Sequence, residues 1–180
     1  MNAITLIDID ILNSIQNSLK SPLLDNVMRK ITALGDFGII WILLLIVFFS
    51  TKEFREVGKT MAIAMLISFI ICNILIKPIV ARIRPFNLVD GINLISAPPL
   101  DYSFPSGHSM FSFTSAMVIF MMVDSKFIKY FSLVLAILIS FSRLYLYFHY
   151  PTDVISGIIL GSVIAYFVVT KRRKNLQTVL

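Results

Sequence analysis

Long apolar segments alternate with short polar connections along most of this chain. They occupy, in order, residues 37–51, 60–76, 104–123, about 128–147 and about 153–170. A membrane-spanning helix needs roughly 17–25 apolar residues, so we expect the short first segment to begin near Asp36 or before it. Because only helices and closed barrels satisfy the backbone inside a bilayer, the pattern predicts an all-α, polytopic membrane helix bundle with about five transmembrane helices.

Residues 1–34 have a different pattern, in which apolar and polar positions alternate at helical spacing. The pair Ser21-Pro22 is typical of a helix break followed by a restart. We therefore expect one or two amphipathic interfacial helices that lie along the membrane surface. The apolar positions recur every three or four residues: Ile4, Ile7, Ile11 and Ile15, then Leu24, Val27, Met28 and Ile31.

Composition indicates an integral membrane protein, since 57% of the residues are hydrophobic and 14% are charged, against about 25% charged in soluble domains. We expect a single membrane-embedded domain over 1–180. Cys72 is the one cysteine, which excludes an internal disulfide and a cysteine zinc cluster. The N-terminus carries Asp8 and Asp10 and no basic region, so we predict no cleavable signal peptide.

The net charge of +6 comes from basic residues that fall at segment ends, which predicts a bilayer rather than a nucleic-acid partner. Five spans place the connections alternately on two sides. The side with the larger excess of Lys and Arg is predicted to be cytoplasmic. That side holds the 51–59 loop, the 124–129 turn and the C-terminal tail, 171–180. Three polar stretches around 77–85, 104–108 and 142–153 then meet on the extracytoplasmic face.

Those three stretches combine cations with two histidines. Lys77 and Arg84 are seven positions apart, which on one helix places them on one face. With Arg143 they would repel a metal ion, so we expect no metal and no cofactor. Arg and Lys suit a phosphate group instead. Ser106 and Gly107 open a helix whose free N–H groups also favour an anion.

His149 and Asp153 lie four positions apart, close enough for the carboxylate to orient the ring. A neutral histidine can attack phosphorus, and His108 would protonate the departing oxygen and later activate water. A plainer interpretation stays open for each residue taken alone. In it Arg143 extends to the interface, His149 is an interfacial aromatic residue and Asp153 caps a helix.

The order and spacing of these residues resemble the three signature motifs of the type 2 phosphatidic acid phosphatase (PAP2) superfamily, which also includes vanadium haloperoxidases. The resemblance covers about 75–155 and implies a metal-independent membrane lipid phosphatase. In it, His149 is the nucleophile, Asp153 orients it and His108 is the general acid. The residues that would hold the phosphate are Lys77, Arg84, Ser106, Gly107 and Arg143. The matching stretches are Lys77 to Arg84-Pro85, Pro105-Ser106-Gly107-His108, and Ser142-Arg143 through His149 to Asp153.

The resemblance selects a phosphate and leaves the lipid open. Short bacterial undecaprenyl diphosphate phosphatases are the favoured comparison, with phosphatidylglycerophosphate or phosphatidic acid as the alternative substrate. Two hypotheses of another class stay open: a non-enzymatic lipid-phosphate binder or transporter, and a haloperoxidase. We expect residues 1–34 and the long polar connection 86–104 to form the lipid entrance. No feature of the sequence indicates how many copies of the chain associate.

Smaller features are predicted to be structural. Arg82 lies outside the motif, and two roles stay open for it: contact with a second phosphate or headgroup, or a cation extended to the interface. Cys72 and Asn73 are expected to pack between helices. Gly157 and Gly161 have the spacing of a close helix contact.

Overall fold

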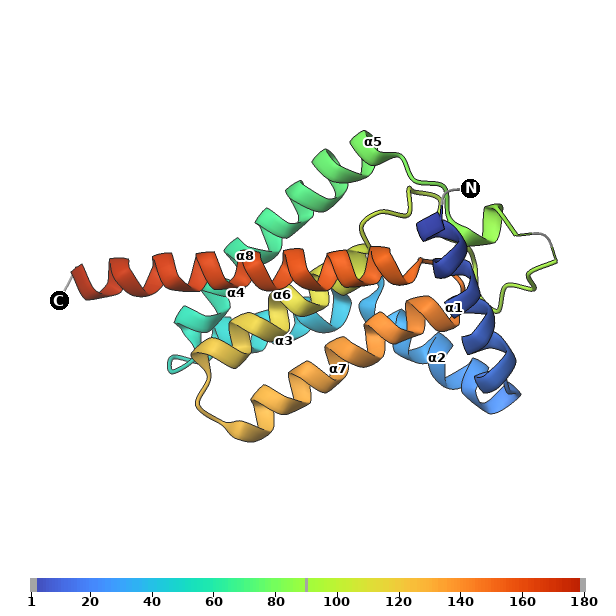
Figure 1. The fold of residues 1–180 in the computed structure, drawn as a ribbon. Helices are drawn as coiled ribbons and strands as arrows, with labels where there is room; N and C mark the ends of the chain where they lie inside the picture. The colour runs from blue at the N-terminus through green and yellow to red at the C-terminus, as the bar shows by residue number, and fades with distance from the viewer. Residues whose placement is uncertain (1–2, 90, 179–180) are drawn as a thin grey trace.

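The structure is a computed structural model that describes residues 3–89 and 91–178. The ends of the predicted N-terminal and C-terminal segments, 1–2 and 179–180, and position 90 of the long connection lie outside the described residues. The helices follow one another as shown in Figure 1. They are α1 (Ala3–Leu19), α2 (Pro22–Gly35), α3 (Ile39–Ser50), α4 (Arg55–Phe69), α5 (Lys77–Val80), α6 (Gly107–Met122), α7 (Lys126–Tyr145) and α8 (Pro151–Thr178).

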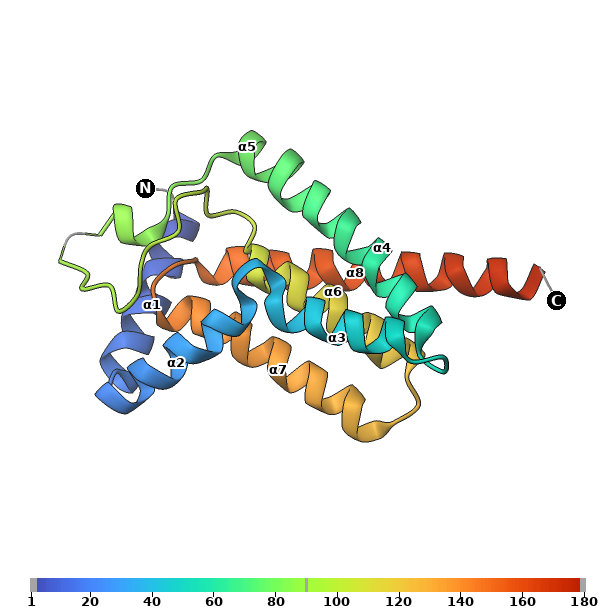
Figure 2. The ribbon, with the colours of Figure 1, turned by 180° about the vertical axis from the view of Figure 1, so that it is seen from behind.

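Helix α6 is the centre of the bundle and packs against α4, α7 and α8 (Figures 1 and 2). Its buried positions include small polar residues, which let neighbouring helices approach closely and bond across the interface. Trp41 of α3 donates its indole N–H to Ser112 Oγ over 2.9 Å, and Thr114 Oγ1 lies 2.6 Å from Ser68 Oγ of α4. The core of this bundle is therefore held by packing and by hydrogen bonds together.

The predicted close contact of α8 is confirmed at Gly157 and Gly161. A Cβ atom at Gly161 would lie 2.4 Å from the carbonyl oxygen of Met110, and one at Gly157 would lie 2.7 Å from that of Ser106. Only glycine permits this approach between the backbones of α6 and α8. The contact holds the start of α6 against the start of α8, where the candidate site lies.

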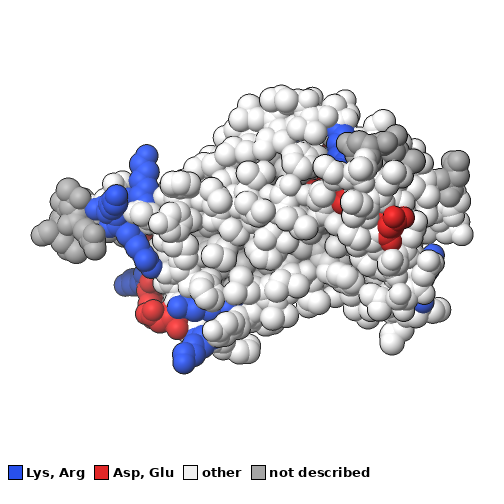
Figure 3. All heavy atoms as spheres, in the orientation of Figure 1, with Lys and Arg blue, Asp and Glu red and all other residues white. Residues whose placement is uncertain are grey.

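The surface has the distribution expected of a membrane protein. Figure 3 shows Lys and Arg gathered at the end of the molecule that holds the C-terminus, and a broad uncharged surface beyond it. Large apolar side chains such as Val47, Leu66 and Ile159 are exposed on the helices, as a bilayer would require. Within the described residues, four segments are long and apolar enough to cross a membrane, and Gly107–Met122 is a shorter apolar helix. A polytopic bundle of about five spans is thus confirmed.

The first apolar segment and the amphipathic stretch before it are not separate. By length and hydropathy, Pro22–Ser50 is one candidate span, interrupted by a sharp bend between α2 and α3. At the bend, Phe37 and Gly38 adopt left-handed backbone angles, with φ of 52° and 69°. The sequence predicted that a helix begins near Asp36 or before it. In the structure α2 runs to Gly35, and the bend that follows places Asp36 at the edge of a cavity.

The helix that carries Lys77 stops before it reaches Arg84. The turn Ile70–Ile76 is π-helical, and α5 stops at Val80, where Ala81 is left-handed with φ of 46°. Pro78 cannot donate a backbone hydrogen bond, which weakens the helix here. Arg84 therefore lies in extended backbone, and the prediction that Lys77 and Arg84 share one helical face is wrong.

The C-terminal tail differs in form from the prediction. Helix α8 continues to Thr178, so the basic residues of the predicted C-terminal tail are helical. Arg172 is 2.7 Å from Glu56 of α4, which ties this end of α8 to the bundle. Helix α1 lies across the opposite end of the bundle, beside the connection between α5 and α6 (Figure 1).

Candidate active site

Residues of several helices and of the long connection line a cavity of about 650 Å³. It lies between the bend at Asp36, the start of α6, the end of α7 and the connection that follows α5. Motif residues that are far apart in the sequence meet on its wall, including Lys77, Arg84, Gly107, His108, Arg143 and His149. Asp153 and Ser106 are buried behind this wall.

Three cationic side chains line the cavity, and each is bonded to another group of the protein. The Lys77 ammonium and the Arg84 guanidinium both bond to the carboxylate of Asp101. Arg84 also donates to the carbonyl oxygen of Phe148 over 2.7 Å. Arg143 donates to Thr32 Oγ1 of α2 over 2.6 Å. These fixed donors form a preorganised cradle for an anion, which loses little conformational entropy when it binds one.

His149 lies in the short connection between α7 and α8 and is 1% exposed. Its Nε2 atom faces Arg84 Nη1 at 3.1 Å, on the side of the cations. Its Nδ1 atom is 3.5 Å from Asp153 Oδ2. Burial, followed by the charges of Arg84 and Arg143, lowers the pKa of His149 well below its usual value. The ring is therefore neutral at physiological pH, with one nitrogen directed at the anion cradle.

Asp153 is fully buried and firmly placed in the first turn of α8. Its Oδ2 atom accepts hydrogen bonds from the Tyr150 backbone N–H over 3.0 Å and from Ser103 Oγ over 2.5 Å. A carboxylate that accepts several hydrogen bonds keeps a fixed orientation. Asp153 Oδ2 thus lies 3.5 Å from His149 Nδ1, and that buried nitrogen makes no hydrogen bond within the described residues.

His108 occupies the first turn of α6, on the other side of the cavity. Its Nε2 atom is 3.0 Å from Asp36 Oδ1 and 3.5 Å from Arg143 Nη1. The imidazole packs so closely against Gly35 that a Cβ there would lie 2.6 Å from His108 Cδ2. An imidazole beside a carboxylate can hold a proton and deliver it to an oxygen in the cavity.

Ser106 and Gly107 complete the side of the cradle formed by α6. Ser106 Oγ accepts from the Ser109 backbone N–H over 3.4 Å and so caps the helix. The position of a Cβ on Gly107 would be 4.0 Å from Lys77 Nζ. The start of α6 thus lies beside the cations, and the N-terminus of a helix favours an anion.

The sequence pattern of the PAP2 superfamily matches residues 58–177, which include every one of these motif residues. The chain belongs to the PAP2 superfamily. Its PAP2 motifs supply the cations, both histidines and the buried carboxylate described above.

Several proteins are similar to this PAP2 chain. An undecaprenyl-diphosphatase of Sulfolobus acidocaldarius is 34% identical over 127 residues, which are 71% of this chain and 61% of that protein. The crystal structure of Aquifex aeolicus LpxE has a TM-score of 0.80 at 28% identity, covering 91% of this chain and 95% of that one. A transmembrane PAP2-type phosphatidylglycerolphosphate phosphatase from Bacillus subtilis also has a TM-score of 0.80, at 27% identity, covering 97% and 88% of the two chains.

The PAP2 site contains acidic residues that the sequence did not reveal. Asp101, from the long connection, joins Lys77 to Arg84 and so brings together the two cations that the helix does not align. Burial raises the pKa of Asp101, but its bonds to Lys77 and Arg84 outweigh this and hold it at about 2. Asp36 was considered only as the start of a helix. In the sequence, Asp101 and Asp36 are each a single acidic residue near a polar motif. Such residues are too common for this feature to identify a site.

Arg82 has neither of the two roles considered for it. It donates to Asp153 Oδ1 over 2.5 Å and to Asp8 Oδ2 over 2.8 Å, so it contacts the buried carboxylate beside His149 and does not line the cavity. Cys72 is buried in the main apolar core, as predicted, whereas Asn73 lines the cavity.

Proposed function

We propose that this protein is an integral membrane phosphatase that hydrolyses a lipid phosphate or diphosphate without a metal ion, through a phosphohistidine at His149. The observation that carries the proposal is the placement of His149. One ring nitrogen faces Arg84 at 3.1 Å and the other faces the buried Asp153 at 3.5 Å. This arrangement gives a neutral nucleophile directed at a cationic cradle.

In the first step, the phosphate lies between Lys77, Arg84 and Arg143. His149 Nε2 attacks the terminal phosphorus and the P–N bond forms. The P–O bond to the leaving group breaks, and that group is the lipid monophosphate of a diphosphate substrate or the lipid alcohol of a monophosphate. His108 gives its proton to the departing oxygen, while Asp153 stabilises the positive charge that develops on the His149 ring.

In the second step, the neutral His108 takes a proton from water, whose oxygen attacks phosphorus. The P–N bond breaks, inorganic phosphate leaves and His149 is neutral again. Asp36, at 3.0 Å from His108, favours the protonated ring that starts the next cycle.

For the substrate, we favour a polyprenyl diphosphate such as undecaprenyl diphosphate. The match to the Sulfolobus undecaprenyl-diphosphatase, at 34% identity, supports this choice. A glycerophospholipid phosphate is the second candidate, because the Bacillus phosphatidylglycerolphosphate phosphatase has the same fold over 97% of this chain. The positive-inside rule supports a cavity on the extracytoplasmic face and a cytoplasmic C-terminus.

The test is phosphate release by the purified full-length protein in detergent, in the presence of EDTA. Undecaprenyl diphosphate, phosphatidylglycerophosphate and phosphatidic acid are compared side by side, each with and without vanadate, which resembles five-coordinate phosphorus. We expect release that resists EDTA, is inhibited by vanadate and is fastest with the diphosphate. Faster release from phosphatidylglycerophosphate or phosphatidic acid would replace the preferred substrate.

Two outcomes would contradict the reaction itself. Loss of all activity in EDTA would show that a metal ion takes part. A folded protein that binds these lipids and releases no phosphate from any of them would be a binder or transporter, the alternative of another class.

A further inference from the structure

The carboxylate that orients His149 is itself held from behind by Arg82. Arg82 Nη1 donates to Asp153 Oδ1 over 2.5 Å and to Thr152 Oγ1 over 2.7 Å. The Arg82 guanidinium also lies over the Tyr150 ring, 3.8 Å from its centre. Arg82 is thus fixed in position by three residues of one segment, 150–153, and contacts the Asp153 oxygen that His149 leaves free.

A second carboxylate, from α1, holds Arg82 in turn. Arg82 Nη2 donates to Asp8 Oδ2 over 2.8 Å. Asp8 also accepts from the Thr152 backbone N–H over 3.1 Å and from Thr152 Oγ1 over 2.6 Å. Every one of these bonds joins α1 to residues at or next to the catalytic carboxylate.

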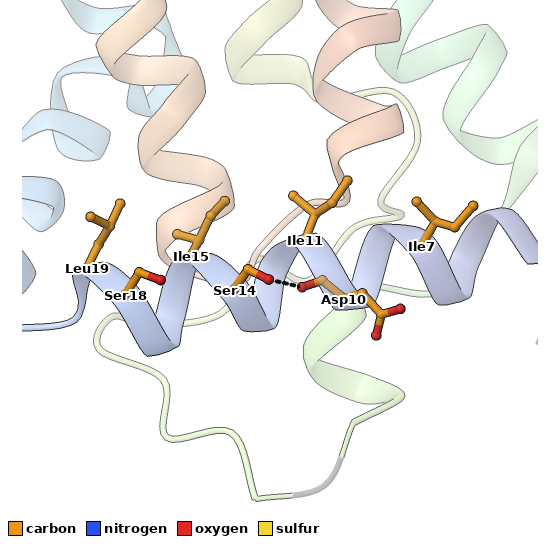
Figure 4. Close-up of a pocket in the computed structure, with 7 residues that line it drawn as sticks. All are labelled: Ile7, Asp10, Ile11, Ser14, Ile15, Ser18 and Leu19. Carbon is orange, nitrogen blue, oxygen red and sulfur yellow. Dashed lines mark hydrogen bonds between the residues drawn. The ribbon is translucent and has the colours of Figure 1, made fainter.

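The burial of Asp8 is unexpected for a helix of this kind. Asp8 is 1% exposed, whereas Ile7, next to it, is 60% exposed. Figure 4 shows Ile7, Ile11, Ile15 and Leu19 along one side of α1, with the carboxylate of Asp10 directed away from them. Burying a carboxylate is costly unless it is paired and hydrogen-bonded. An amphipathic surface helix needs no such group, so the buried acid indicates a role at Arg82 and Thr152.

The charges alternate in sign along this line of contacts. Asp8 is negative, Arg82 positive and Asp153 negative, and Asp153 faces the His149 ring that becomes positive when it attacks phosphorus. Arg82 withdraws part of the charge of Asp153, and Asp8 offsets Arg82. The balance between them sets how strongly Asp153 attracts a proton or a phosphoryl group at His149.

We propose that Asp8 and Arg82 are positioning residues, which fix the orientation and the effective charge of Asp153 and through it the reactivity of His149. Helix α1 then belongs to the catalytic apparatus and does more than line a lipid entrance. The inference rests on the proposed function, because it assigns these residues to the step that His149 performs.

The proposal predicts opposite electrostatic effects for the two residues. Asp8→Asn leaves Arg82 paired with Asp153 but no longer with Asp8, so Arg82 offsets more of the Asp153 charge and His149 becomes harder to protonate. Arg82→Gln returns the full charge to Asp153, which makes His149 easier to protonate. The other charged or titratable groups around His149 are Arg84, Arg143, Lys77 and His108, and both variants leave them in place.

The experiment measures kcat, KM and the pH dependence of kcat/KM for the full-length protein in detergent, with p-nitrophenyl phosphate and with the preferred lipid. For Asp8→Asn and Arg82→Gln we expect kcat to fall roughly 10–100-fold, with KM within about twofold because the cradle is intact. The acid limb of the kcat/KM profile reports the protonation of His149. It should move by roughly half a pH unit or more, to lower pH for Asp8→Asn and to higher pH for Arg82→Gln.

Asp10→Asn is the matched control, since it removes the same charge from an exposed position of the same helix. It should have the kinetics of the unchanged protein. Thermal unfolding and size-exclusion profiles identify variants that have lost their fold, and Thr152→Val then serves as a second, uncharged change in the same contacts, with the same expected loss of kcat.

The outcomes separate the two proposals. An unchanged protein that releases no phosphate would contradict the proposed function. Two results would overturn only the positioning role of Asp8 and Arg82. One is a kcat for Asp8→Asn equal to that of the unchanged protein, and the other is an acid limb that moves in the same direction in both charge variants.

Discussion

Replacing His149 with alanine is expected to remove phosphate release from every substrate, with kcat lower by about 10⁴-fold or more. The neighbouring groups cannot take over, since Arg84 is a cation and Asp153 is buried behind the ring, 3.5 Å from Nδ1. Water alone would have to attack phosphorus. The measurement is steady-state phosphate release from a lipid and from p-nitrophenyl phosphate.

The same variant should still bind anions, which distinguishes loss of chemistry from loss of the site. Lys77, Arg84 and Arg143 keep their partners on Asp101, Phe148 and Thr32 in the absence of the imidazole. Binding of vanadate or inorganic phosphate, followed by calorimetry, should persist. Turnover that stays within tenfold of the unchanged protein would exclude His149 as the nucleophile.

Replacing His108 with glutamine should produce a loss that depends on the leaving group. The alcohol of a phosphate monoester such as phosphatidic acid departs poorly without a proton, so on that lipid we expect kcat to fall roughly 10²–10⁴-fold. The loss in the first step should be much smaller with p-nitrophenyl phosphate, because nitrophenolate leaves without protonation. The measurement is the initial burst of nitrophenol, which reports this step before water attacks the phosphoenzyme.

His149→Ala is the control for this comparison, because it should abolish the burst as well as turnover. Asp36→Asn tests the same role more gently, since the carboxylate lies 3.0 Å from His108 and favours its protonated form. It should lower lipid turnover less than His108→Gln does. A nitrophenol burst that slows as much as lipid turnover in His108→Gln would show that His108 does not act as the general acid.

The local part of this site could be predicted from the sequence, and the structure shows why. Ser106-Gly107-His108 begins a helix through a serine cap, and His149 and Asp153 are joined by a single turn. Their relative positions depend on a few consecutive residues. The glycine contact of α8 with α6 likewise follows from the spacing of Gly157 and Gly161, since both lie on one helix face.

The rest depends on contacts between distant segments, which spacing does not encode. Lys77 and Arg84 were expected to share a helix face, but the helix stops at Val80 and Asp101 joins them instead. Asp8 looked like a polar residue of a surface helix, and its partner Arg82 looked like an interfacial cation. Only the fold brings these two together, across more than seventy positions of the chain.

The bend between α2 and α3 was also beyond sequence reasoning. The short first segment indicated that a helix must begin earlier, but not that Phe37 would adopt a φ of 52°. This bend places Asp36 against His108, so an irregular turn inside an apolar segment contributes directly to the site. Such backbone angles are rare for a bulky residue and therefore cannot be expected from propensity.

The most direct test of the account is whether a phosphorylated enzyme forms at His149. The full-length protein would be mixed with substrate, quenched in alkali within the first turnover, and digested for mass spectrometry. We expect a phosphate on the peptide that contains His149, stable in alkali, labile in acid and missing from His149→Ala. Normal turnover with no phosphorylated peptide, or with the phosphate on another residue, would contradict it.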